Sequence, residues 1–117
     1  MNERKTPERD PGGIDSHTPG AKLDEGKVLA GVLGDFAYAL EMVARVGTFG
    51  ALKYSRGGWQ QVADGVTRYS DALWRHLLAE RHQVDDMDSG LPHAAHLAWN
   101  ALARLELMIG SKERPQS

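Results

Sequence analysis

The residues best suited to chemistry lie in one short stretch, DDMDSGLPHAAHLAWN, in which an acidic turn leads directly into a helix. The turn carries Asp85, Asp86 and Asp88, and the helix carries His93 and His96. Histidines three positions apart share one face of a helix and can serve one site. Imidazole and carboxylate together suit Mg²⁺, Mn²⁺ or similar ions, whereas Ca²⁺ alone would not explain the histidines. The stretch is a candidate metal site, and a solvated helix face behind an acidic cap is the alternative.

A second group of polar residues falls at the edge of an apolar stripe that predicts a helix over about residues 66–82. His76 and Glu80 lie one turn apart there. Burying a chargeable group without a partner is costly or shifts its pKa, so this pair needs a partner or a metal. A core histidine bonded to Glu80 would satisfy the same pattern. Asp71 and Arg75, four positions apart, could form no more than a surface ion pair.

The segment GAKLDEGK is a candidate for holding phosphate groups. It places Lys22 and Lys27 around Asp24 in a turn that contains glycine. Two lysines on such a turn can hold a polyphosphate by charge, although the spacing is not that of a P-loop. A solvated basic turn is the alternative interpretation.

Aromatic residues lie at and just beyond the end of the first predicted helix. Tyr54 and Trp59 offer flat apolar faces on which a base could stack, and Lys53 beside them could reach a phosphate. Isolated aromatic residues near a helix end also serve simply to close a core. The sequence by itself leaves both interpretations open.

Three helices are expected to position these residues, over about residues 33–54, 66–82 and 91–109. Strand-like alternation is absent. Pro92 suits the first turn of the third helix, and Gly110 is a plausible stop for it. Along the side of that helix, next to its apolar face, runs a polar stripe: His93, His96, Asn100 and Arg104.

The composition excludes several functional classes. Of the 117 residues, 41% are hydrophobic and 26% are charged, which is ordinary for a globular protein. A formal net charge of −2 disfavours duplex nucleic acid as a partner. Without cysteine there is no disulfide, thiol nucleophile or cysteine-ligated metal. The apolar stretches are too short for a membrane span and the start lacks the apolar core of a signal peptide, so we expect a cytoplasmic protein.

The expected domain organisation is simple. Residues 1–20 mix charge with proline and glycine and predict a disordered arm. Residues 21–109 form the all-α domain, and residues 110–117 form a frayed tail. Three short helices with separate apolar stripes bury only a modest core, so we expect a small helical bundle completed by oligomerisation.

Five short motifs in a fixed order resemble the dATP/dGTP diphosphohydrolase family. They are GAKLDEGK, then VARVGTFGALKY with a following tryptophan, then RHLLA, DDMDSG and LPHAAHLAWNAL. The resemblance covers residues 20–107, and the family is akin to the MazG-type all-α pyrophosphohydrolases. The sequence departs from the family pattern at Asp88, where a glutamate is usual. The glutamate-rich metal motif of the wider group is also absent, and whether Glu41, Asp71 or Glu80 supplies a missing carboxylate stays open.

The resemblance implies roles for particular residues. It assigns catalysis to Lys53, Arg75 and His76. It assigns metal binding to Asp86, Asp88, His93 and His96. It assigns substrate binding to Lys22, Asp24, Lys27, Tyr54 and Trp59, to which we add Asn100 as a further base contact.

The implied reaction is hydrolysis of a purine (deoxy)nucleoside triphosphate, dGTP, GTP or dATP, between the α and β phosphates, with Mg²⁺ or Mn²⁺ as cofactor. The protein would be a homodimer or homotetramer with neither nucleic acid nor membrane as partner. In related phages such an enzyme supplies (d)GMP for synthesis of 2-aminoadenine nucleotides. The rival hypotheses are a non-enzymatic helical adaptor and an HD-type phosphohydrolase, and the second is disfavoured because no histidine here precedes an aspartate.

Overall fold

The computed structural model describes residues 10–113, with side chains described to residue 110. The chain divides into two compact units, Met1–Asp35 and Phe36–Ser117. Of the predicted arm and the predicted tail, residues 1–9 and 114–117 lie outside the described residues. The described part of the arm forms turns and contains neither helix nor strand.

The first unit is organised around Asp10. Its carboxylate accepts hydrogen bonds from the backbone N–H groups of Gly12 (2.8 Å) and Lys22 (2.9 Å). The predicted glycine-containing turn is present, because the N–H of Lys27 donates to the carbonyl of Asp24 at 3.0 Å. A 3₁₀ helix, η1 (Ala30–Phe36), follows this turn.

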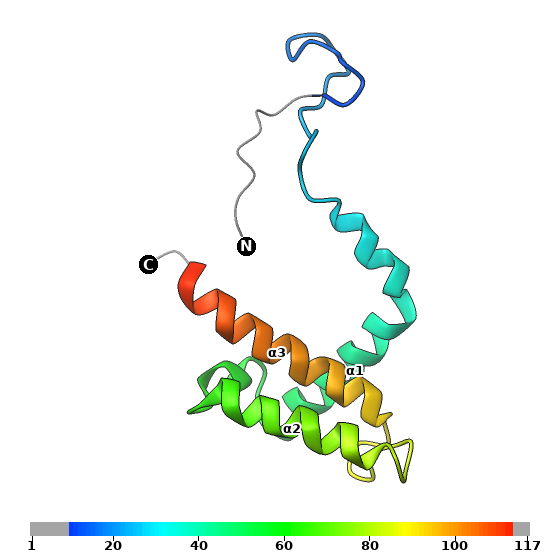
Figure 1. The fold of residues 1–117 in the computed structure, drawn as a ribbon, viewed down its shortest axis with the longest axis vertical. Coiled ribbons are helices and arrows are strands. Elements are labelled where there is room, and N and C mark those ends of the chain that lie inside the picture. Colours follow the sequence, from blue (N-terminus) through cyan, green and yellow to red (C-terminus); the bar gives the residue numbers. More distant parts are fainter. Residues whose placement is uncertain (1–9, 114–117) are drawn as a thin grey trace. The chain divides into compact units, whose positions relative to one another are not determined.

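The second unit contains three α-helices and one short 3₁₀ helix. They are α1 (Ala37–Lys53), η2 (Gly58–Gln61), α2 (Gly65–Ala79) and α3 (His93–Glu113). Helix α2 lies alongside α3, and α1 packs against α3 from another side (Figure 1). The expected all-helical class is confirmed for residues 10–113, where the one strand-like feature is a single antiparallel bridge between Asp85 and Pro92. None of the helices in this range has the length and hydropathy to cross a membrane.

Two helix boundaries differ from expectation. The first predicted helix begins as the 3₁₀ helix η1, and its α-helical part starts only at Ala37. Gly31 and Gly34 lie in that opening segment and lower its α-helix propensity. At the other end, α3 continues through Gly110 to Glu113. In a helix interior, glycine lowers helix stability by only about 1 kcal/mol relative to alanine. Such a cost does not end a helix by itself, and a glycine stop also needs a left-handed backbone turn.

An aromatic cluster joins η2, α2 and α3. The Trp59 ring lies edge-on to Tyr69 at 6.3 Å and to Trp99 at 5.7 Å, and Tyr69 also donates a hydrogen bond to the Trp59 carbonyl at 2.7 Å. Helix α1 reaches this cluster at Gly47, where an added Cβ would lie 3.1 Å from Nε1 of Trp99. The missing side chain therefore permits the close approach of α1 to α3.

The buried core of the described residues is small. The buried apolar side chains are those of Val46, Ala95 and Ala103. Larger apolar side chains stay exposed on α1, where Leu52 is 83% accessible, and on α3, where Leu102 is 50% accessible. A single chain thus leaves much of its apolar surface uncovered, as the helical stripes predicted.

The contact at Gly47 predicts a position-specific loss of stability. Gly47→Val places a branched side chain against Trp99, and we expect overpacking to lower the free energy of unfolding by about 1–3 kcal/mol relative to Gly50→Val. A Cβ at Gly50 meets no atom within 4 Å, so that variant controls for the shared change in helix propensity. Urea denaturation followed by circular dichroism measures both, and equal stability of the two variants would contradict the packing described.

Candidate metal centre

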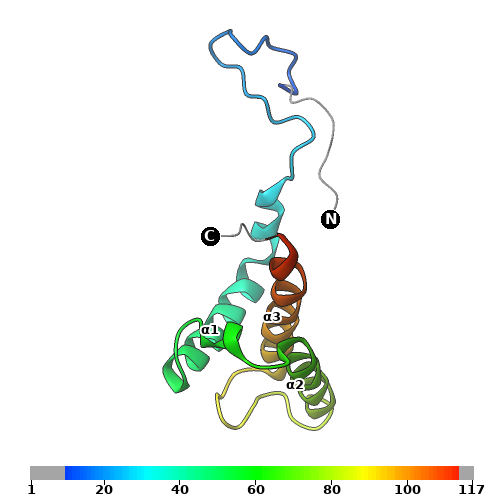
Figure 2. The same ribbon diagram turned by 90° about the vertical axis from the view of Figure 1, so that its left-hand side faces the viewer.

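The connection between α2 and α3 is closed by backbone hydrogen bonds. The N–H of Asp86 donates to the Leu91 carbonyl at 2.8 Å, and the N–H of His93 donates to the Val84 carbonyl at 2.8 Å. Gly90 turns the chain with a φ of 75°, a left-handed conformation that favours glycine. Figure 2 shows this connection, in yellow, folded back at the end of the helix pair. The closure returns Asp86 to the beginning of α3.

The Asp86 side chain is fixed by its own turn. Its Oδ1 accepts hydrogen bonds from the N–H groups of Asp88 at 3.0 Å and Ser89 at 2.9 Å. Burial raises the pKa of Asp86, but these hydrogen bonds and the nearby His96 outweigh burial, and the pKa lies below its usual value. Asp86 is therefore an oriented carboxylate anion at neutral pH.

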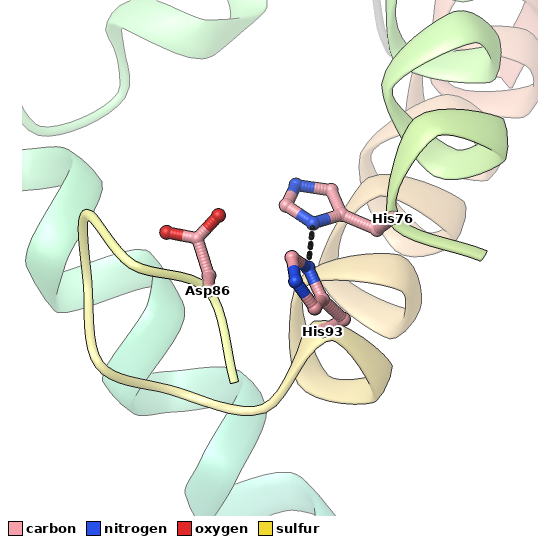
Figure 3. Close-up of side chains that lie close together, drawn as sticks. All are labelled: His76, Asp86 and His93. Carbon is pink, nitrogen blue, oxygen red and sulfur yellow. Dashed lines mark hydrogen bonds between the residues drawn. The ribbon is translucent and has the colours of Figure 1, made fainter. Parts of the chain in front are cut away.

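Three side chains from three segments meet beside this turn. His76 comes from the last turn of α2, Asp86 from the connection, and His93 from the first position of α3. One ligand atom from each lies within 4.8 Å of the others. Figure 3 shows the three side chains facing a common space, with a dashed line between the Nδ1 atoms of His76 and His93, which are 2.9 Å apart.

The donor chemistry of this cluster fits a divalent metal ion. Metal–nitrogen bonds of about 2.0–2.1 Å place neighbouring ligands of one ion about 2.9–3.4 Å apart. The Nδ1 atoms of His76 and His93 meet that spacing, and the carboxylate of Asp86 supplies negative charge beside them. A hydrogen bond from one imidazole N–H to the other ring satisfies the same distance when no ion is bound.

His96 supports the cluster from α3, one turn beyond His93. It is buried, and its ring stacks on the His76 ring with centroids 4.6 Å apart and planes 11° apart. Its Nε2 and the Ser89 Oγ form a hydrogen bond of 2.6 Å. The Phe49 ring lies edge-on to the His96 ring, with ring centroids 6.5 Å apart. These contacts fix the His96 ring, and through it the ring of His76.

Burial sets the charge state of these imidazoles. It is the largest cause that lowers the pKa of both His76 and His96 below the usual 6.5, and the neighbouring imidazoles lower it further. The negative charge of Asp86 opposes this shift in both residues without reversing it. Both rings are therefore neutral at physiological pH, the form in which imidazole can ligate a metal.

The predicted metal set is only partly brought together. Asp86 and His93 lie in the cluster, where His76, predicted for catalysis, joins them. His96 lies against the cluster. Asp88 instead forms an ion pair with Lys53, whose Nζ is 2.6 Å from its Oδ2 and whose pKa this pair raises. The pair ties the acidic turn to the end of α1.

The predicted base contacts lie in different environments. Tyr54 is 78% exposed. Trp59 belongs to the aromatic cluster with Tyr69 and Trp99. Asn100 is buried, and its side-chain N–H donates to the carbonyl of His96 at 2.8 Å, one helical turn away. Tyr54 is thus the predicted base contact with the most exposed ring.

The remaining predicted residues lie outside the cluster. Lys22, Asp24 and Lys27 belong to the first unit, whereas the cluster lies entirely in the second. Arg75 is exposed on α2. The carboxylates left open by the sequence are also outside it, because Glu41 pairs with Arg45 at 3.2 Å and both Asp71 and Glu80 are exposed.

Ser89 is the site residue that the sequence analysis did not single out. Besides its bond to His96, its Oγ accepts a hydrogen bond from the N–H of Leu91 at 3.1 Å. A serine just before a glycine and a helix start is a common local signal for such backbone bonds. Its bond to His96 depends on the folded turn and has no local signal.

A family model described as dATP/dGTP diphosphohydrolase, N-terminal, matches residues 17–116. The chain belongs to this family. A curated family relative, a dATP/dGTP diphosphohydrolase of Salmonella phage PMBT28, is 40% identical over 80 residues, which cover 68% of this chain and 26% of the relative. The chain thus spans about a quarter of that relative's length. No solved structure matches this family member.

The lowered pKa values of His76 and His96 predict the pH dependence of stability in the metal-free protein. Well above pH 6.5 these rings are neutral in the folded and unfolded chains alike, so their contribution to stability is fully present. As the pH falls below 6.5, the unfolded chain binds protons more readily, so stability decreases.

Urea unfolding in the presence of a chelator should therefore give a lower free energy of unfolding at pH 5.5 than at pH 7.5. The double substitution His76→Gln and His96→Gln should reduce this difference, whereas His82→Gln, at an exposed position outside the cluster, serves as the control. A stability that is level or rises between pH 7.5 and pH 5.5 would show that the rings are not held neutral by burial.

Proposed function

We propose that this chain contributes a metal-supported active site to an enzyme that hydrolyses purine (deoxy)nucleoside triphosphates, dGTP, GTP or dATP, to monophosphate and pyrophosphate. The observation that carries the proposal is the convergence of His76, Asp86 and His93 at the end of the α2–α3 pair. Membership of the diphosphohydrolase family and the name of the phage relative support the choice of reaction.

His76, Asp86 and His93 would hold the divalent ion, Mg²⁺ or Mn²⁺. When bound, such an ion supplies positive charge at the phosphate oxygens and acidifies an attacking water. The protein's own contribution is placement, because the turn orients Asp86, and Ser89 with His96 orients the histidine rings. Fixed geometry of this kind reduces the reorganisation needed in the transition state.

Lys53 and Arg75 would hold the phosphate chain. The ion pair of Lys53 with Asp88 is exposed, and exposed pairs exchange readily for other charged partners. Lys53 would therefore pass from Asp88 to a phosphate oxygen when substrate binds. On the turn of the first unit, Lys22 and Lys27 would bind phosphate by charge, and Asp24 is proposed as a substrate-binding residue.

The base would stack on the exposed ring of Tyr54, next to Lys53 in the chain. The other two proposed base contacts are Trp59, which lies in the aromatic cluster, and Asn100, which donates a hydrogen bond to the His96 carbonyl. This proposal includes the biological role that the resemblance implies, which is the supply of (d)GMP for 2-aminoadenine nucleotides in a phage. It also includes a cytoplasmic setting.

A second copy of the chain, as homodimer or homotetramer, would cover the exposed apolar faces. On α3 one such face is continuous over two turns and consists of Leu102, Leu105, Met108 and Ile109, each at least 36% exposed. At the end of α1 the exposed apolar residues include Leu52 and, just after the helix, Tyr54, on either side of Lys53. Self-association through such surfaces is the usual way for a small helical domain to gain core area.

The reaction itself is the first prediction of this proposal. The purified protein with dGTP or dATP and Mg²⁺ or Mn²⁺ should release pyrophosphate and the monophosphate, resolved by ion-exchange chromatography. His93→Ala should lower the rate by at least about tenfold, because loss of a metal-site group costs about 10–100-fold in affinity or activity. His82→Ala, at an exposed position outside the cluster, should keep the wild-type rate.

Two outcomes would overturn the proposal. Release of inorganic phosphate or tripolyphosphate as the first product would reject cleavage between the α and β phosphates. No turnover of any purine triphosphate by folded protein would favour the non-enzymatic adaptor, for which the exposed apolar faces suffice.

The oligomer is the second prediction. Light scattering at micromolar concentration should give a mass of at least two chains. The double substitution Leu102→Glu and Leu105→Glu should shift the protein to smaller species, because it places charges on the apolar face of α3. Ala94→Glu adds charge at an exposed position near the start of the same helix and should leave the mass unchanged. A monomeric wild-type protein would contradict the expected assembly.

A further inference from the structure

We propose that the cluster of His76, Asp86 and His93 selects a first-row transition-metal ion, Mn²⁺ or a later one that accepts imidazole more readily, and discriminates against Mg²⁺. This inference deepens the proposed function by choosing between its two ions. Its catalytic consequence rests on that function, whereas binding of the ion itself does not.

The donor set carries the choice. Two of the three ligands are imidazoles and one is a carboxylate. Mg²⁺ demands oxygen ligands in a near-ideal octahedron and usually keeps several waters with one or two carboxylates. Imidazole suits manganese only moderately and Co²⁺, Ni²⁺ and Zn²⁺ better, following the general order of divalent affinities. A site with nitrogen in the majority therefore favours these ions over Mg²⁺.

The two nitrogen donors are placed for one ion before it arrives. Their Nδ1 atoms lie 2.9 Å apart, the spacing of adjacent ligands in an octahedron with metal–nitrogen bonds of about 2.1 Å. His93 is only 7% exposed at the first position of α3, and its backbone N–H is bonded to Val84. Little freedom remains to be lost when an ion binds, which increases affinity.

A second layer of contacts holds the ring of His76. His96 stacks on it in near-parallel planes, and Ser89 is bonded to the Nε2 of His96. Ser89 also donates its backbone N–H to Asp86 and so links the carboxylate to the imidazoles. Groups that orient metal ligands in this way are typically worth about 10–100-fold in metal affinity. Ser89 is accordingly a positioning residue for the ion.

The alternative is a hydrogen-bonded histidine pair with a purely structural role. An N–H of one ring donating to the other explains the 2.9 Å distance without an ion. The two explanations predict different results when metal ions alone are added to the protein. Only a metal site gives saturable binding that depends on both histidines and on Asp86.

The test uses the purified full chain and metal ions without nucleotide. Co²⁺ reports its ligands through visible absorption, and Mn²⁺ binding is followed by electron paramagnetic resonance. We expect saturable binding of both, tighter for Co²⁺ than for Mn²⁺. A hundredfold excess of Mg²⁺ should displace neither ion substantially.

Matched variants locate the site. His76→Ala and His93→Ala should abolish the Co²⁺ absorption, and Asp86→Asn, which keeps the side-chain shape, should weaken binding. Ser89→Ala should weaken Co²⁺ binding about 10–100-fold while leaving the helical circular dichroism unchanged. His82→Ala removes an exposed histidine outside the cluster and should bind Co²⁺ as the wild type does.

Each result decides the matter. If the folded wild-type chain binds neither ion, only the structural histidine pair remains. The same holds if the Asp86→Asn and His93→Ala variants bind the ions as tightly as the wild type does. Displacement of Co²⁺ by Mg²⁺ at a comparable concentration would overturn the proposed selectivity. Binding of Co²⁺ with this variant pattern, together with no hydrolysis of any triphosphate, would reject the proposed function and leave the metal site standing.

Discussion

The closure of the α2–α3 connection is the constraint on which the candidate site depends. Backbone bonds from Asp86 to Leu91 and from His93 to Val84 fold the acidic turn back onto the start of α3. Without that closure, Asp86 would belong to an exposed acidic segment with no metal-binding geometry. The same turn presents the Ser89 hydroxyl to His96, so one local structure positions both the carboxylate and, indirectly, the imidazoles.

The site is better defined than the core beneath it. Buried apolar side chains in the described residues are small, and the close packing comes mainly from the aromatic cluster around Trp99 and from Gly47. Hydrophobic stabilisation scales with buried apolar area, so a chain that leaves Leu52 and Leu102 exposed gains little of it alone. The fixed geometry of the candidate metal site therefore comes from hydrogen bonds and ring stacking more than from a large core.

Local patterns predicted the helices well, and only in part which candidate ligands lie together. Apolar periodicity located three helices, since that period reports which face is buried. Their ends were less predictable: Gly110 resembles a stop, yet it continues α3 because nothing there forces a left-handed turn. Spacing paired His93 with His96 because they share a helix face, but the imidazoles that lie with Asp86 in the candidate site are those of His93 and of His76 on another helix. Contacts between helices leave no trace in the spacing within one helix.

The sequence by itself determined the all-helical class, the family, and the residue types available for chemistry. These conclusions depend only on the order, spacing and composition of the residues, which are properties of the linear sequence. Only the tertiary structure decided which of these residues contact one another. In the folded chain Asp88 forms an ion pair with Lys53, Trp59 packs among other aromatic rings, and Ser89 is hydrogen-bonded to His96. The physical reason is that a metal site requires ligand atoms a few ångströms apart, and residues 7 to 17 positions apart in the chain reach that distance only when α2, the turn and α3 pack together.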